Sequence, residues 1–172
     1  KNGITRYDGL EFQNVPLVNQ QEVEVFDLLQ TVDGQIWAAT SAGLYRHETS
    51  GFTKLGPATG APQNKIHCLL ESRSGNLMLG HQNGLSIQTA PTQFEEAPKA
   101  GLTTGEITSI QHRAQGGFWV ASLAGGLHRF DGDRFQVLPS SDGLRNAVIF
   151  DMEYDRSGNL WIATLAKGVA IR

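Results

Sequence analysis

The sequence predicts an all-β fold built from repeated four-stranded units, and three observations lead to this prediction. The 172 residues include 20 glycines, about 12% against a usual share of about 7%, which indicates many tight turns. One short motif returns four times at nearly constant spacing. No segment carries the long 3.6-residue apolar period of an amphipathic helix, so we expect few helices or none.

The repeated motif is a turn glycine followed, three residues later, by a large apolar side chain. The steps from Trp37 to Met78, Trp119 and Trp161 are 41, 41 and 42 residues. The turn glycines keep the same steps: Gly34, Gly75, Gly116 and Gly158. After each motif comes a glycine followed by an aliphatic residue: Gly43-Leu44, Gly84-Leu85, Gly126-Leu127 and Gly168-Val169. The pair Gly3-Ile4 adds a fifth copy, and a period shared by several positions indicates a repeat architecture.

Each unit is predicted to contain four short antiparallel strands. The first strands are expected at Val25–Gln30, Ile66–Glu71, Ile107–His112 and Ile149–Tyr154. The second strand carries the tryptophan or methionine, and the third begins at the glycine–aliphatic pair. The fourth is centred on a recurring phenylalanine: Phe12, Phe52, Phe94 and Phe135. Glycine and asparagine supply the positive φ that tight hairpin turns need. Four strands in about 41 residues are typical of a β-propeller blade.

We therefore predict one β-propeller repeat domain over residues 1–172, a segment of four blades. The units run roughly over 3–42, 43–83, 84–125 and 126–167, with a final strand at 168–172. Stacked blades bury their large apolar residues between them, so Trp37, Trp119 and Trp161 are expected to be largely buried. The sequence starts with a third and a fourth strand and ends on a third strand. An open arc, or closure through a second copy, is therefore expected rather than a monomeric four-blade ring.

Charge and composition exclude several partners. The net charge is −3, from 14 basic and 17 acidic residues, and there is no basic run, so we expect no nucleic-acid partner. No apolar run approaches the roughly 18 residues of a membrane span, so this segment is not expected to insert into a membrane. An export signal or anchor would lie outside it. The single cysteine, Cys68, excludes an intramolecular disulfide. It aligns with Asp27, Ser109 and Asp151 and is expected to be a buried, unpaired thiol.

No catalytic, metal or cofactor site is predicted, and we expect the protein not to be an enzyme. No nucleophile, base and oxyanion-stabilising set converges in the sequence. The histidines lack the spacing of metal ligands: His47, His67, His81, His112 and His128. Two of them, His67 and His112, fall on expected innermost strands, where a channel site is an alternative to ordinary structural roles. Three arginines share one register of the third strand, which favours a structural role: Arg6, Arg46 and Arg129.

Two strings resemble the signature of the two-component regulator propeller repeat. They are DRSGNLWIAT at residues 155–164, and GLHRFDGDRF at 126–135 followed by DGL at 142–144. The resemblance covers essentially the whole chain and is weakest in the second unit. There Met78 replaces tryptophan, and His81 stands where the other units have Thr40, Ser122 and Thr164.

The resemblance implies a segment of a larger propeller of about seven blades. Such propellers form the periplasmic or other extracytoplasmic sensors of bacterial membrane receptors. Their outputs are histidine kinases, hybrid two-component proteins or diguanylate cyclases, and some members look like sensors of carbohydrate fragments.

The predicted function is thus ligand recognition within a bacterial transmembrane signalling receptor, with a small-molecule or oligosaccharide ligand. A scaffold propeller for protein partners is the alternative, and a sialidase-like glycosidase is the least favoured. Other expected partners are neighbouring blades of the parent chain or a second copy. Ligands of propellers usually meet the face that carries the loops into the first strand and between the second and third. Polar residues that break the repeat there are the predicted ligand-binding residues: His81, Gln82, Asn83, Arg145, Asn146 and Lys167.

Overall fold

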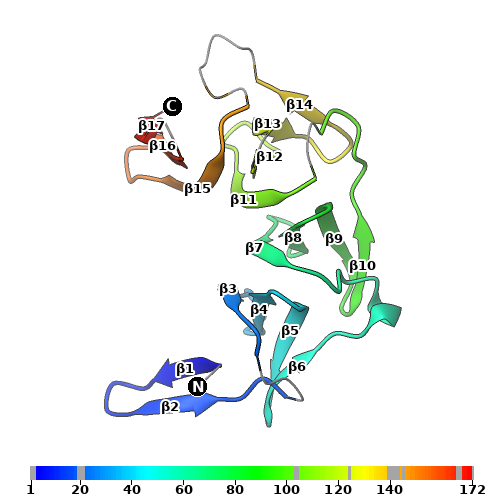
Figure 1. Ribbon diagram of the computed structural model, residues 1–172, viewed down its shortest axis with the longest axis vertical. Helices are drawn as coiled ribbons and strands as arrows, with labels where there is room; N and C mark the ends of the chain where they lie inside the picture. Colours follow the sequence, from blue (N-terminus) through cyan, green and yellow to red (C-terminus); the bar gives the residue numbers. More distant parts are fainter. Residues whose placement is uncertain are drawn as a thin grey trace.

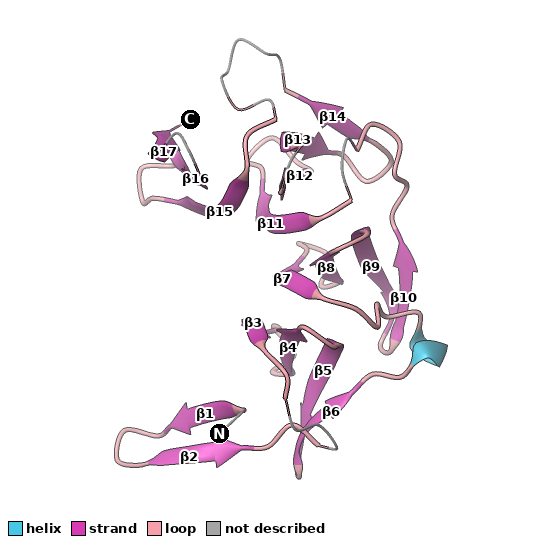
Figure 2. Cartoon of the chain, viewed as in Figure 1, coloured by secondary structure: helices cyan, strands magenta, loops and turns pink. Residues whose placement is uncertain are grey.

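The computed structural model describes residues 3–18, 22–102, 105–123, 125–138, 144, 146–165 and 168–171. Within this part the chain forms antiparallel strands (Figure 1) and one short 3-10 helix, η1 (Pro57–Thr59). Figure 2 shows that the rest of the described chain consists of strands joined by loops. The prediction of an all-β fold with few helices is therefore confirmed. With three residues in η1, no described helix has the length and apolar character to cross a membrane.

Three sheets have four strands each, in the order of the sequence. The first contains β3 (Val25–Gln30), β4 (Ile36–Thr40), β5 (Gly43–Glu48) and β6 (Gly51–Lys54). The second contains β7 (Ile66–Glu71), β8 (Leu77–His81), β9 (Gly84–Ala90) and β10 (Gln93–Glu96). The third contains β11 (Ile107–His112), β12 (Phe118–Ser122), β13 (Gly126–Phe130) and β14 (Phe135–Val137).

The two ends of the described chain form smaller sheets. The fourth sheet contains β15 (Ile149–Tyr154), β16 (Leu160–Thr164) and β17 (Gly168–Ile171), and the hairpin contains β1 (Ile4–Tyr7) and β2 (Phe12–Val15). The hairpin matches the third and fourth strands of a repeat, as expected from its sequence. All four first strands begin and end where the sequence places them. Each four-stranded sheet takes strands from two adjacent sequence units, because a unit begins at a third strand.

The four sheets stack face to face along an open arc (Figure 1). Strands β3, β7, β11 and β15 line its inner edge, and the hairpin lies at the opposite end of the arc from β15–β17. Within the described residues, β1 pairs with β2 alone and β17 with β16 alone. The expectation of an open arc rather than a four-blade ring is confirmed for this chain.

The hydrophobic core lies between neighbouring sheets. Trp37 on the first sheet is 4% exposed and meets the Phe94 ring of the second sheet edge-on, with centroids 6.4 Å apart. Trp119 on the third sheet is partly buried, and its indole N–H donates to the Tyr154 hydroxyl of the fourth sheet at 3.1 Å. In both cases the next sheet along the chain covers the tryptophan.

The predicted burial of Trp161 is wrong. This side chain is 42% exposed, because it faces away from the third sheet and no further sheet of the described residues covers it. Its indole N–H instead donates to Oδ2 of Asp155 in the preceding turn, at 3.0 Å. Burial of the repeated tryptophan therefore depends on the neighbouring sheet and not on its register alone.

Two glycines allow the loops that enter the second and third sheets to cross the outer strands of those sheets. Gly60 and Gly101 lie 41 residues apart, and both have positive φ, +74° and +83°. A Cβ atom on Gly60 would overlap the carbonyl oxygen of Phe94, and one on Gly101 would overlap that of Phe135. Both positions therefore require glycine for space as well as for backbone conformation.

Candidate ligand-binding site

Every inner strand contains one extra residue near its start. The pairing of β3 with β4 matches Val25 to Thr40 and then Asp27 to Ala39, so Phe26 has no partner. The same irregularity occurs in the other three sheets. The residues without a strand partner are Phe26, His67, Thr108 and Phe150. A bulge of this kind turns a side chain away from the regular alternation of a strand.

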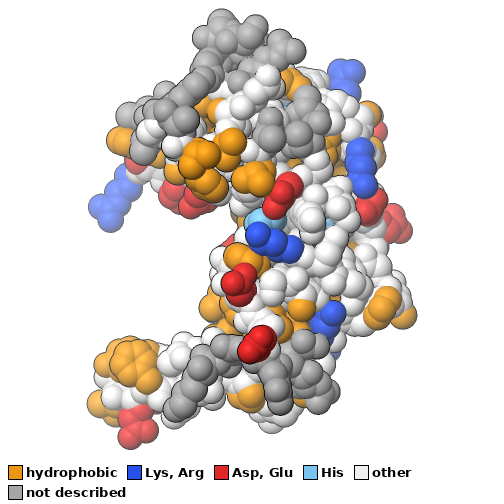
Figure 3. All heavy atoms as spheres, in the orientation of Figure 1, with side chains coloured by type: hydrophobic (Ala, Val, Ile, Leu, Met, Phe, Trp, Pro, Cys, Tyr) orange, Lys and Arg blue, Asp and Glu red, His pale blue; other side chains and the backbone are white. Residues whose placement is uncertain are grey.

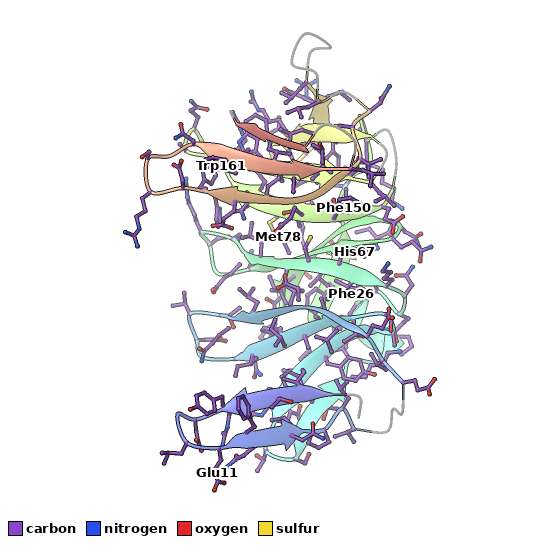
Figure 4. The ribbon with its side chains drawn as sticks, turned by 60° about the vertical axis from the view of Figure 1, so that its left-hand side comes forward. Glu11, Phe26, His67, Met78, Phe150 and Trp161 are labelled. Atoms are coloured by element: carbon purple, nitrogen blue, oxygen red, sulfur yellow. The ribbon has the colours of Figure 1, made fainter. Side chains whose placement is uncertain are left out.

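These bulge residues lie in a column along the inner edge of the arc. Figure 4 shows Phe26, His67 and Phe150 one above another, each on its own sheet. The rings of Phe26 and His67 are neighbours, with centroids 5.7 Å apart. Phe26 and Phe150 are among the exposed large apolar side chains of the described residues. The inner edge thus presents aromatic rings to solvent at repeated positions.

The first three bulge residues contact the start of the next inner strand. The Lys65 ammonium group lies 4.7 Å from the centroid of the Phe26 ring, a cation–π distance. The Nε2 atom of His67 lies 2.8 Å from Oε1 of Glu106. The hydroxyl of Thr108 donates to the carbonyl oxygen of Ile149 at 2.7 Å. Among the described residues, Phe150 has no such neighbour because no fifth inner strand follows it.

The next residue of each inner strand is small or acidic: Asp27, Cys68, Ser109 and Asp151. Asp27 accepts hydrogen bonds from the amides of Leu28 and Leu69, both at 2.8 Å. Asp151 accepts the Ser109 hydroxyl at 3.1 Å. Polar side chains therefore connect adjacent inner strands, which are not paired with each other as a sheet.

The prediction that Cys68 is a buried, unpaired thiol is confirmed. Burial is the largest influence on its pKa and raises it far above the usual value, and the negative charge of Asp27 adds to the effect. The thiol therefore stays protonated at neutral pH. Such a group is a poor nucleophile and a poor metal ligand.

A cavity of about 480 Å³ opens along this inner edge. Its lining residues come from the inner strand of all four sheets: Phe26, Asp27, His67, Cys68, Leu69, Thr108, Ser109, Ile110, Gln111, Phe150, Asp151 and Glu153. Figure 3 shows histidine and charged side chains gathered on this concave side of the arc. A volume of this size holds a small ligand.

The charges in the cavity are mainly negative. Asp27, Asp151 and Glu153 line it, and no lining residue is a lysine or an arginine. Burial raises the pKa of Asp27 above its usual value, against the lowering effect of its two amide hydrogen bonds, and Asp151 raises it further. Gln111 joins the third and fourth sheets by donating to Oε2 of Glu153 at 3.1 Å. An anionic ligand would be repelled here, whereas hydroxyl groups would find several acceptors.

His67 is held mainly in its neutral form. Burial lowers the pKa of its imidazole, and the positive charge of Lys65 lowers it further, while Glu106 opposes both effects. A neutral imidazole offers one donor and one acceptor nitrogen. Nε2 is engaged by Glu106, so a further hydrogen bond of this imidazole would be made through Nδ1.

The predicted ligand-binding residues lie elsewhere. His81 is the last residue of β8, and Gln82 and Asn83 form the turn to β9. His81 is buried there: its Nε2 lies 3.1 Å from the Ser86 hydroxyl, and its Nδ1 accepts the amide of Asn83 at 3.3 Å. Gln82 and Asn83 are exposed. These contacts are those of a turn-stabilising group, and the ligand role of the three residues stays a prediction.

Of the remaining predicted residues, the structure describes Asn146. Asn146 is exposed, adopts the left-handed conformation with φ of 57°, and lies against Gly126 at the start of β13. Arg145 and Lys167 lie outside the described residues. None of the described members of the predicted set lines the inner-edge cavity. Their ligand role stays a prediction.

Sequence reasoning missed most of the cavity, although one signal for it is present. Phe26 and Phe150 are large aromatic residues at positions where alternation along the strand predicts solvent exposure. The fold does not require aromatic residues at these positions, because the second and third sheets have His67 and Thr108 there.

Among the described residues, no group of three or more side chains could hold a metal ion.

Comparison with known proteins identifies the repeat. Residues 143–166 match the family model described as two component regulator propeller, which confirms the resemblance seen in the sequence. The chain thus carries a repeat of this family within a β-propeller fold. No curated protein matches the sequence.

Several solved structures share the fold. The extracellular domain of BT4673 of B. thetaiotaomicron, described as a one-component system, has a TM-score of 0.75 and 20% identity over 96% of this chain and 26% of that one. A catalytically inactive virginiamycin B lyase from Staphylococcus aureus, crystallised with quinupristin, has a TM-score of 0.67 and 14% identity over 94% and 59%. PorZ of Porphyromonas gingivalis, a surface component of the type-IX secretion system, has a TM-score of 0.64 and 13% identity over 98% and 28%. The chain spans about a quarter of the BT4673 domain.

Proposed function

We propose that this chain is a ligand-recognition segment of an extracytoplasmic sensor and that it binds a small neutral oligosaccharide at its inner edge. The observation that carries the proposal is the cavity lined by the inner strand of all four sheets. The two-component regulator propeller repeat at residues 143–166 supports a sensor role. The likeness to the BT4673 extracellular domain supports a location outside the cytoplasm.

The chemistry of the lining supports a polyhydroxylated ligand. The exposed rings of Phe26 and Phe150 offer flat apolar surfaces for the C–H faces of a sugar ring. The carboxylates of Asp151 and Glu153 offer acceptors for hydroxyl groups, and so does the amide oxygen of Gln111, whose N–H groups are engaged by Met152 and Glu153. Ligand sites commonly combine such apolar surfaces with a few fixed polar groups. The excess of carboxylates disfavours uronic acids, sulfated sugars and phosphates.

We also infer binding without catalysis. The Cys68 thiol is buried and protonated. The Ser109 hydroxyl donates to Asp151 rather than to a histidine base. His67 is engaged by Glu106 across the second and third sheets. The fold alone does not exclude catalysis, since the virginiamycin B lyase has a similar fold. The proposal therefore rests on the absence of an activated nucleophile among the described lining residues.

An array of oligosaccharides tests the proposal. The labelled 172-residue chain is expected to bind at least one neutral oligosaccharide and to leave uronic-acid-containing ones unbound. Phe150→Ala is expected to weaken that binding about tenfold, a loss of about 1.4 kcal/mol. Val32→Ala is the control, because Val32 is fully exposed in the turn between β3 and β4. Absence of any neutral ligand, or equal binding by both variants, would overturn the proposal.

A further inference from the structure

The column of bulge residues along the inner edge changes at its third position. Aromatic or imidazole rings occupy the first, second and fourth positions, as Phe26, His67 and Phe150 (Figure 4). The third position holds Thr108 on β11, which has no ring. All four residues line the inner-edge cavity. The small side chain of Thr108 therefore leaves room in the cavity between the rings of the second and fourth sheets.

One step along the column has the spacing of two rings in contact. The centroids of Phe26 and His67 lie 5.7 Å apart, with the ring planes tilted by 40°, within the range of aromatic pairs. The steps along the arc are alike, because every inner strand has the same bulge. A flat ring beside Thr108 would accordingly contact the ring of the second sheet on one side and that of the fourth sheet on the other.

The hydroxyl groups at this place are committed to the protein. The hydroxyl of Thr108 donates to the carbonyl oxygen of Ile149 at 2.7 Å. The hydroxyl of Ser109 donates to Oδ1 of Asp151 at 3.1 Å. Both contacts join β11 to β15 and fix the fourth sheet against the third. This part of the cavity therefore offers a ligand mainly the ring faces of its two neighbours.

These two rings are suited to stacking in different ways. The imidazole of His67 is held by Glu106, whose Oε1 lies 2.8 Å from its Nε2, and by the Phe26 ring. The ring of Phe150 is 50% exposed and presents a flat apolar surface to the cavity. Groups that are already fixed in the free protein lose little conformational entropy when a ligand binds.

We propose that one pyranose ring of the ligand lies beside Thr108, between the rings of His67 and Phe150, and that this position selects sugars whose ring substituents are all equatorial. The inference rests on the proposed oligosaccharide site and names its ligand class: β-linked chains of glucose or xylose. In such a sugar the axial positions of both faces carry only hydrogen atoms. Both faces can therefore stack on a flat ring.

An axial hydroxyl group disfavours this position. Mannose carries one at C2 and galactose one at C4, so in each sugar one face presents an oxygen atom to a ring of the protein. That hydroxyl would lose its hydrogen bonds to water without gaining a partner, which costs free energy. Equatorial hydroxyl groups leave the edge of the sugar instead, where Asp151 and Glu153 provide acceptors in the same cavity.

Tetrasaccharides that differ in one configuration test the selection. Isothermal titration calorimetry of the 172-residue chain compares cellotetraose and xylotetraose with mannotetraose, whose rings carry the axial hydroxyl at C2. The tighter ligand of the first two is expected to bind at least about tenfold more tightly than mannotetraose. Equal or tighter binding of mannotetraose would overturn the inference. So would the failure of both all-equatorial tetrasaccharides to bind.

The selection and the proposed function fail separately in this experiment. A neutral oligosaccharide of another class that binds at the inner edge would overturn the selection and leave the proposed function standing. Absence of any neutral ligand would overturn both.

A substitution at the third position of the column tests where the sugar lies. Thr108→Phe continues the column of rings and is expected to weaken binding of the all-equatorial tetrasaccharide at least about tenfold, because phenylalanine takes the place of the sugar. The fold accepts phenylalanine here, since the first and fourth sheets have Phe26 and Phe150. Thr89→Phe is the matched control, because Thr89 is exposed on β9 and does not line the cavity.

Urea unfolding shows whether Thr108→Phe and Thr89→Phe are folded. Binding by a folded Thr108→Phe variant as tight as that of the unchanged chain, or equal losses in the two variants, would overturn the inference. The comparison of tetrasaccharides uses the unchanged chain, so it decides the selection even where Thr108→Phe does not fold.

Discussion

The ammonium group of Lys65 lies 4.7 Å from the centroid of the Phe26 ring, so a cation–π contact joins the inner edges of the first and second sheets. The same lysine acts on His67, two residues further along the chain. Its positive charge lowers the pKa of the imidazole, which burial has already lowered, while Glu106 raises it. The inner edge is therefore one electrostatic unit across the first three sheets.

This arrangement predicts opposite effects of two substitutions on the pKa of His67. Lys65→Met removes a positive charge and is expected to raise it. Glu106→Gln removes a hydrogen-bonded negative charge and is expected to lower it. Titration of the imidazole resonances by NMR measures both shifts. Shifts of the His67 pKa in the same direction in both variants would contradict the described contacts. Lys54→Met is the control, because Lys54 is not part of this group of contacts.

The burial of His81 predicts a loss of stability in mild acid. Burial lowers the pKa of its imidazole from 6.5 to about 4, so the unfolded chain binds the proton first as the pH falls. The free energy of unfolding is expected to be unaffected by this group above pH 6.5 and to decrease by about 3 kcal/mol between pH 6.5 and pH 4.

His81→Thr isolates the contribution of this histidine to the pH dependence. Threonine stands at the equivalent position of the first sheet, where the Thr40 hydroxyl accepts the amide of Ala42 and donates to the carbonyl oxygen of Gly43. Urea unfolding of both proteins at several pH values measures the difference. A variant as acid-sensitive as the unchanged protein would show that His81 is not buried in its neutral form.

The close approach at Gly101 predicts a large effect of one methyl group. Gly101→Ala places a Cβ atom against the carbonyl oxygen of Phe135. Gly132→Ala is the matched control, because Gly132 also has positive φ, +104°, but no atom lies within 4 Å of the added methyl. Gly101→Ala is expected to lower the free energy of unfolding by about 1–3 kcal/mol more than the control. Equal losses would mean that the loop does not cross the outer strand as described.

The burial of Cys68 predicts slow modification of its thiol. Labelling by a thiol reagent under native conditions is expected to proceed only as fast as the protein opens, and to become immediate in denaturant. Val32→Cys in a Cys68→Ser background provides an exposed thiol for comparison. Native labelling of Cys68 at the rate of the exposed thiol would contradict its position between the inner strands.

Much of the fold can be predicted from the sequence because the repeat determines it locally. Turn glycines and the shared period place the four first strands at the observed residues. The exposure of Trp161 could not be predicted in this way, because its register is that of Trp37 and only the neighbouring sheet differs. Burial in a repeat fold depends on what is stacked against each unit.

The candidate site is less predictable because it depends on pairing irregularities. Alternation along β3 predicts that Phe26 faces solvent. Its place in one column with His67 and Phe150 follows from the bulge, in which Phe26 has no partner on β4. His81 breaks the repeat, which predicts a ligand role. Both of its ring nitrogens nevertheless contact its own hairpin. A residue that departs from the repeat thus indicates a position with a different environment. The role of that residue follows from the contacts that its side chain makes.

The most direct test of the central claim, ligand binding at the inner edge, is to map the contact surface. The full-length ¹⁵N-labelled chain is titrated with the neutral oligosaccharide that binds most strongly on the array, and amide shifts are followed by NMR. We predict that the largest shifts occur at residues 26–28, 67–69, 108–111 and 150–153. Shifts confined to the turns at 33–35 and 74–76, at the far end of the inner strands, would contradict the proposed site.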